Sequence, residues 1–116
     1  MPAYNRIDRI SEEVKKELSV IVRELKDPRI TSVVSVVNVS VTKDLKFAKA
    51  YISVFGDEKT QKGVMDALKS ASGFIRREIG HRINLRATPE FTFVLDNSIE
   101  YGAHINQLLN DISNKN

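Results

Sequence analysis

Cysteine is absent from the chain, and no stretch approaches the length and apolar character of a membrane-spanning segment. Without cysteine the protein has no disulfide framework and no thiolate chemistry. Crossing a bilayer takes roughly 20 apolar residues, and the N-terminus carries no apolar stretch resembling a signal peptide. We therefore expect a cytoplasmic protein that does not associate with a membrane.

The motifs of common enzyme classes are also absent. The sequence contains no GxxxxGK[ST] phosphate loop, no GxSxG elbow and no HExxH pair. His81 and His104 stand alone, without other ligands at metal-binding spacing. The acidic pairs Glu12-Glu13 and Asp57-Glu58 lie in charge-mixed stretches, without the apolar pocket that would shift a carboxyl pKa. We expect no enzyme activity, no metal and no cofactor.

The composition is that of a globular protein, with 41% apolar and 28% charged residues in 116. This length suits one domain with a real core, and we expect a single domain over residues 1–116, with a frayed end at 113–116. The net charge is +3, and residues 61–90 carry six Lys/Arg against three Asp/Glu. Such a local basic excess is typical of a surface for a polyanion.

Hydrophobic periodicity predicts the first three elements. A helix is expected from about Asn5 to Lys26, with Asp27-Pro28 ending it. A strand follows over residues 33–42, and a second over Phe47–Phe55 forms an antiparallel hairpin with it. The alternating pattern places each of two sets on one face of its strand: Val33, Ser35, Val37, Val39 and Val41 in the first strand, and Ala48, Ala50, Ile52 and Val54 in the second.

The second half of the chain predicts two helices, a strand and a last helix. Asp57 is a plausible N-cap, and an apolar stripe then runs on to Ile83. Ser72-Gly73 interrupts it, because both residues are poor helix formers. A third strand is expected over Glu90–Asp96, and Ser98 begins a final helix. The apolar residues that recur in register along these elements are Val64, Leu68, Ala71, Ile75, Ile79, Phe91, Phe93, Leu95, Ile105, Leu108, Leu109 and Ile112.

This order resembles the type II KH fold, in which a GxxG loop joins two helices and clamps nucleotide backbone. Here the joint is Ala71-Ser72-Gly73, an AxG, and in this the chain is similar to the ribosome-binding factor A family. The run from Val39 to Ser53 resembles the family's hairpin, and Pro89–Phe93 resembles its closing strand. The resemblance implies an α+β, KH type II-like fold: helix-strand-strand-helix-kink-helix-strand, a three-stranded sheet and a short C-terminal helix.

The resemblance also implies a function. Members associate with the free 30S subunit or its precursor, assist 16S rRNA 5′-end processing and small-subunit maturation, and are needed more in the cold. The implied partner is 16S rRNA within the 30S subunit, and a ribosome-associated GTPase is a further candidate, because release needs another agent. We expect a monomer. Two alternatives stay open: a generic KH-like RNA binder, and a protein-interaction module that docks through its first or last helix.

The predicted RNA-binding residues centre on the AxG joint and the basic helix that follows. Gly73 lacks a Cβ, so a phosphate can approach the main chain there, and free N–H groups begin the next helix. The set is Lys69, Ala71, Ser72, Gly73, Arg76, Arg77, His81, Arg82 and Arg86. Competing interpretations are a merely solvated basic face and a packing role for Gly73. Tyr51 could stack on a base or pack on the sheet.

Overall fold

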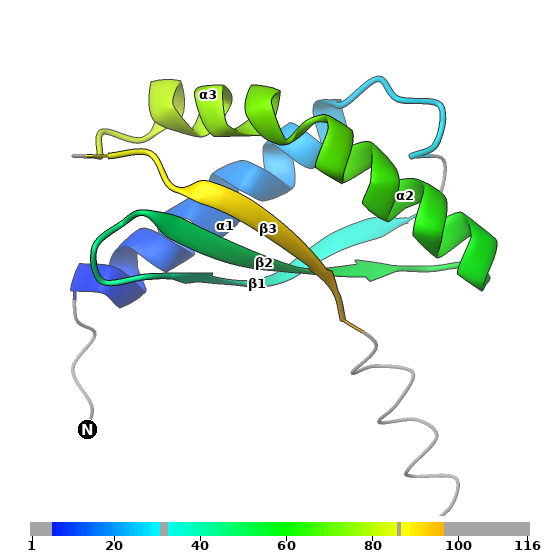
Figure 1. Cartoon of the computed structure of the whole chain (residues 1–116), viewed down its shortest axis with the longest axis horizontal. Coiled ribbons are helices and arrows are strands. Elements are labelled where there is room, and N and C mark those ends of the chain that lie inside the picture. Colours follow the sequence, from blue (N-terminus) through cyan, green and yellow to red (C-terminus); the bar gives the residue numbers. More distant parts are fainter. Residues whose placement is uncertain (1–5, 31–32, 86, 97–116) are drawn as a thin grey trace, which may run out of the picture.

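The helices lie on one face of a three-stranded sheet in the computed structural model, which describes residues 6–30, 33–85 and 87–96 (Figure 1). In chain order the elements are α1 (Arg6–Glu24), β1 (Val34–Val41), β2 (Phe47–Val54), α2 (Glu58–Ser70), α3 (Ser72–Arg82) and β3 (Glu90–Leu95). The predicted α+β class is confirmed, and so is the order of elements up to the third strand. The predicted helix after Ser98 lies outside the described residues. No helix within the described ranges is long and apolar enough to span a membrane.

The sheet has the order β1-β2-β3, so β2 is its central strand. β1 and β2 are antiparallel and form the predicted hairpin, whereas β2 and β3 are parallel. Parallel neighbours require a crossover connection, and α2 and α3 together supply it. α1 packs on β1, α2 on β3, and α3 against both α1 and β3.

The first strand departs from its predicted face assignment. Val36 pairs with Ile52 and Asn38 pairs with Tyr51, so Val37 is an extra residue in a β-bulge. A bulge exchanges the two faces of the residues before it, because side chains alternate with a period of two. Val36 is therefore buried, and Val33 is 71% exposed. The prediction that Val33, Ser35 and Val37 share the inner face of Val39 and Val41 is wrong.

The core forms where the apolar stripes predicted it. On α1 the buried residues include Ile10, Val14, Leu18 and Ile21, and on α3 Ile75 and Ile79 are fully buried. The second strand buries its predicted apolar face as well. Burying each large aliphatic side chain contributes about 1.5–3 kcal/mol. These stripes fix which side of α3 faces solvent, and thereby which basic residues a partner can reach.

The end of α1 and the β1–β2 turn are held locally. After Glu24, the Arg29 amide and guanidinium donate to the Asp27 carboxylate, and these bonds lower the pKa of Asp27 to about 2. In the β-turn, Leu45 adopts φ of 62° yet is only 7% exposed. The left-handed region costs a non-glycine residue roughly 1–2 kcal/mol, about as much as burial of a leucine side chain returns. Burial of Leu45 therefore holds the turn.

Leu45→Ala and Leu45→Gly test this balance. Alanine loses the burial and keeps the backbone strain, so we expect it to lower the free energy of unfolding by about 2–4 kcal/mol. Glycine loses the same burial but relieves about 1 kcal/mol of strain, so it should be the milder substitution. Urea unfolding of both variants measures the difference. Equal losses, or a worse effect from glycine, would show that the turn is not strained.

Candidate RNA-binding surface

The two helices of the crossover meet at a single residue, Ala71. Its backbone has φ of −87° and ψ of 2°, and its N–H still donates to the Ala67 carbonyl of α2. α3 begins at once, with the Ile75 N–H donating to the Ala71 carbonyl at 2.8 Å. The predicted break is therefore confirmed, and it falls one residue earlier than Ser72-Gly73.

The two helix N-termini differ in how they are capped. Asp57 caps α2 as predicted, accepting the Thr60 N–H at 2.8 Å, and this bond lowers the pKa of Asp57. Ala71 offers α3 no side-chain cap. The first N–H groups of a helix lack intrahelical acceptors, and they carry the positive end of its dipole. The start of α3 can therefore donate to an anion.

Gly73 lies in the first turn of α3, with its backbone exposed. A Cβ built on it would meet nothing within 4 Å, and its φ is not positive. Within the described residues, neither packing nor backbone geometry requires a glycine here. Gly80 of the same helix differs, because a Cβ there would lie 2.9 Å from the Thr88 hydroxyl. The absence of a side chain at Gly73 leaves its backbone accessible from solvent.

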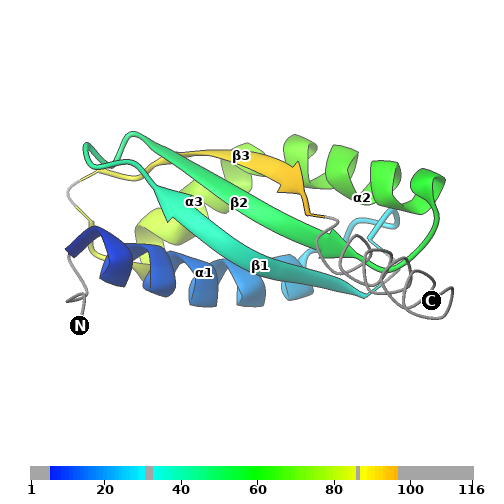
Figure 2. The same ribbon diagram turned by 90° about the horizontal axis from the view of Figure 1, so that it is seen from below.

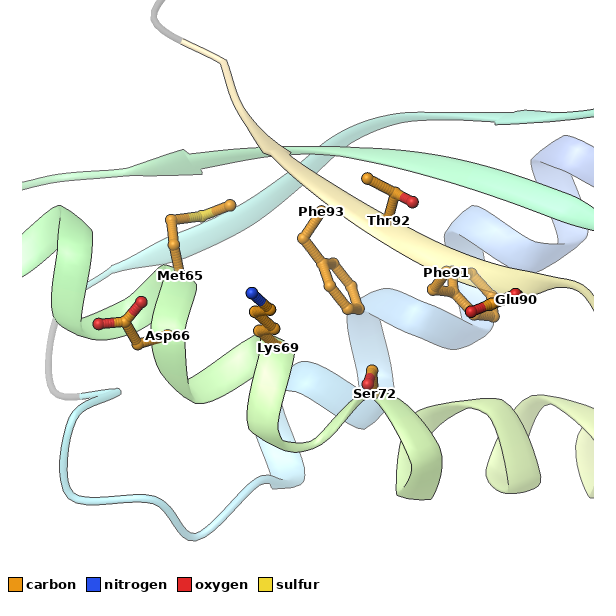
Figure 3. Close-up of a pocket in the computed structure, with 8 residues that line it drawn as sticks. All are labelled: Met65, Asp66, Lys69, Ser72, Glu90, Phe91, Thr92 and Phe93. Carbon is orange, nitrogen blue, oxygen red and sulfur yellow. The ribbon is translucent and has the colours of Figure 1, made fainter.

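A cavity of about 450 Å³ lies between the α2–α3 junction and β3 (Figure 3). Lys69 and Ser72, two of the predicted site residues, line it from the helical side, together with Met65 and Asp66. β3 contributes Glu90, Phe91, Thr92 and Phe93. Met65, Thr92 and Phe93 are not among the residues predicted from the sequence for this surface, because strand alternation does not show which helix covers β3.

The two phenylalanines of β3 form a stacked pair, with ring centroids 6.1 Å apart and planes inclined by 14°. Phe91 is buried, as expected of a core residue. Phe93 is only half-buried, although it packs against the core, and it lines the cavity. Its ring therefore gives the cavity an aromatic wall beside the Lys69 ammonium.

The predicted cations of α3 differ in their partners. Arg77 and His81 are exposed, and no hydrogen bond or ion pair within the described chain engages Arg77. Arg76 donates through Nε and NH2 to the Thr88 carbonyl, at 3.2 and 3.1 Å. It thereby ties α3 to the segment that precedes β3. Arg86 lies outside the described residues.

Arg82 is surrounded by three carboxylates. Its guanidinium lies 3.6 Å from Glu17, 3.1 Å from Glu24 and 3.4 Å from Glu78. The bonds to Glu24 and Glu78 raise the pKa of Arg82. Two of the three glutamates belong to α1, so this cluster joins α1 to α3. Its carboxylates also offset the charge of Arg82, which leaves Lys69 and Arg77 as the better-placed cations for an anionic partner.

Replacing Arg82 and Arg77 by glutamine separates these roles. Arg82→Gln leaves Glu17, Glu24 and Glu78 facing one another, so we expect Tm to fall by several degrees. Arg77→Gln should leave Tm nearly unchanged, because exposed substitutions usually have small effects. Thermal unfolding followed by circular dichroism measures both, and added salt should shrink the Arg82 effect through screening. Equal Tm values for the two variants would contradict the role of the Arg82 cluster in joining α1 to α3.

Known proteins of one family are similar to this chain in sequence and in fold. Residues 6–109 match the family model described as ribosome-binding factor A. The ribosome-binding factor A of Clostridium tetani is 59% identical over 111 residues, covering 95% of this chain and 92% of the relative. A solution structure of a Thermotoga maritima putative ribosome binding factor A is 29% identical with a TM-score of 0.72, covering 81% of this chain and 90% of that one.

A third relative shares the fold. It is the Thermus thermophilus ribosome binding factor A, as a homology model fitted into a cryo-EM map of a 30S complex. It is 24% identical with a TM-score of 0.64, covering 75% of this chain and 91% of that one. The family match spans both helices of the junction and all three strands, and the curated relative is similar along nearly its whole length. This chain belongs to the ribosome-binding factor A family.

Proposed function

We propose that this protein is an assembly factor that binds the free 30S subunit, or its precursor, through the α2–α3 junction and the cavity beside it. The observation that carries the proposal is a convergence at one place. Bare backbone at Gly73, an uncapped helix start, the Lys69 ammonium and the half-buried Phe93 all lie around the same junction. Groups of these kinds can bind the phosphates and the bases of an unpaired stretch of rRNA.

Each group has a role toward RNA. Phosphate oxygens accept from the first N–H groups of α3 and from the Lys69 ammonium. Arg77 contacts a second phosphate or stacks on a base, since a guanidinium can do either. Phe93 offers an aromatic surface within the cavity, and aromatic rings stack on unstacked bases. A one-residue joint presents fewer N–H groups than a GxxG loop, so the side chains carry more of the binding.

Membership of the family supports the choice of partner, because the Thermus relative was fitted into a 30S complex. We infer that binding energy alone holds 16S rRNA while its 5′ end is processed, with no reaction catalysed by this chain. The factor is then needed more at low temperature, because misfolded rRNA leaves its misfolded states more slowly in the cold. The protein acts as a monomer in the cytoplasm, and a ribosome-associated GTPase or subunit joining releases it.

Charge reversal at the free cations tests the surface. Lys69→Glu/Arg77→Glu should weaken co-sedimentation with free 30S subunits by at least about tenfold. The slope of log affinity against log salt should shrink by about two. Arg76 is left intact because its bond to the Thr88 carbonyl is structural.

The matched control reverses two exposed cations of α1, as Arg9→Glu/Lys16→Glu. Both stand beside Glu12 and Glu13, away from the junction. We expect this control to bind almost as the natural protein does. If it loses binding as strongly as the junction variant, net charge rather than the junction determines affinity.

Gly73→Ala separates stability from binding. The added Cβ meets open space, so alanine should raise the free energy of unfolding by up to about 1 kcal/mol. It should nevertheless weaken 30S binding, because the Cβ keeps a phosphate away from the main chain. Gly63→Ala in α2, whose Cβ would make ordinary contact with Arg29, is the control. Unchanged binding by a stabilised Gly73→Ala protein would place the RNA elsewhere.

The same measurements test the alternative partners. A generic RNA binder would show equal affinity for 30S subunits and for unrelated single-stranded RNA. A protein-docking module has one observation in its favour: Val33 and Phe55 are 71% and 80% exposed and lie side by side, joined by the Phe55 N–H and the Val33 carbonyl. Apolar docking there would respond little to salt, whereas phosphate contacts respond steeply.

A further inference from the structure

The face of the sheet opposite the helices is not covered by any described helix (Figure 2). On β2 the inner side chains Ala48, Ala50, Ile52 and Val54 are buried against the helices. The residues between them therefore point to the open face. They are Phe47, Lys49, Tyr51 and Ser53, an alternation of aromatic and basic residues followed by a serine.

These side chains form a shallow depression of about 390 Å³ at the hairpin end of the sheet. Phe47, which is 53% exposed, Lys49 and the half-buried Tyr51 line it from β2. Ser40 and Thr42 line it from the β1 side, and Thr92 from β3. It contains two aromatic rings, one ammonium and several hydroxyls, and none of the described residues that line it carries a carboxylate.

The charge around the depression is positive. Lys43 and Lys46 lie in the adjoining turn, and both are exposed. Two carboxylates lie nearby: Glu90, which pairs with Phe47 across the sheet, and Asp44. Asp44 accepts from the Thr42 hydroxyl at 2.7 Å and from the Lys46 amide at 3.0 Å. The three lysines therefore outnumber the two acids, one of which is already engaged within the turn.

Thr92 connects this depression to the junction surface. It lines both the cavity beside Lys69 and the depression beside Lys49. β3 is the edge strand of the described sheet, so no other described strand lies between the two hollows. A single polynucleotide strand can pass over this edge and reach both faces of the sheet.

We infer that the open face of the sheet is a second RNA-binding surface, on which unpaired bases stack on Phe47 and Tyr51 while Lys43, Lys46 and Lys49 contact phosphates. The inference rests on the proposed function only in taking RNA as the partner; it assigns a separate set of residues. Aromatic side chains on an open sheet, interleaved with cations, are a general solution for single strands, since every base has a stackable face. In a duplex the bases stay stacked on one another, so they cannot stack on an aromatic side chain.

Tryptophan fluorescence tests this surface directly, because the natural sequence contains no tryptophan. Phe47→Trp places one reporter in the depression, Phe74→Trp one beside Gly73, and Phe55→Trp one at the far end of β2. All three phenylalanines are exposed. Each full-length variant is titrated with a single-stranded RNA of about 12 nucleotides and with the corresponding duplex. Circular dichroism confirms that each variant is folded.

We expect the single strand to quench the reporter at position 47 more strongly than the duplex does, and to leave position 55 nearly unchanged. Quenching at 74 but not at 47 would overturn this inference and leave the proposed function standing. Quenching at 47 but not at 74 would support the inference and count against the junction. A blue-shifted emission at 47 that RNA does not change would mean that protein covers the face, either residues 97–116 or a second copy, and would also overturn it.

Affinity gives an independent readout. Phe47→Ala should weaken binding of the same single strand by at least about fivefold, because stacking of one base on an aromatic ring accounts for that much. Phe55→Ala removes a still more exposed ring outside the depression and should have little effect. Equal affinities for the two variants would overturn the inference, provided that both unfold at the natural Tm.

Discussion

Two helices that follow one another directly must both bury an apolar stripe within one helical layer, and the break at Ala71 is what permits it. A straight helix over α2, Ala71 and α3 would be about 38 Å long, whereas the six residues of β3 span only about 20 Å. With the break, α2 packs along β3 and α3 turns toward α1. Leu68 and Ile75 are fully buried on either side of it. Ala71 is half-buried at the corner of this arrangement, and Gly73, two residues further on, is exposed.

The break at Ala71 also determines which cations hold the fold and which remain free. Once α3 turns toward α1, Arg82 meets Glu17 and Glu24, and Arg76 meets the Thr88 carbonyl. Both arginines then hold α3 in place. Lys69 and Arg77 remain directed outward, near the bare backbone of Gly73. Some of the cations in this basic stretch are therefore engaged in holding the fold, and others are free to contact a partner. Only the packing of α3 shows which cation belongs to which group.

The element order, the N-cap at Asp57 and the break near Ser72 could be predicted from the sequence, because each depends on local periodicity or on one residue type. The bulge at Val37 could not, since a run of valines and small polar residues fits both faces of a strand equally well. The burial of Leu45 with a positive φ likewise depends on tertiary packing. The same holds for the cavity: alternation groups Phe91 with Phe93, but only the parallel pairing of β3 with β2 brings them beside Lys69.

The junction alone presents few charges for a partner as highly charged as the proposed one, a ribosomal subunit. Two phosphate contacts, by Lys69 and Arg77, correspond to a salt slope of only about 1.4–1.8. A joint of one residue cannot clamp several nucleotides as a GxxG loop does. Tight binding therefore requires contacts beyond the junction, and β3 shows where they can be made. Because the described helices cover only one face of the sheet, an RNA strand leaving the junction over Thr92 can reach three further lysines and two aromatic rings without any change in the fold.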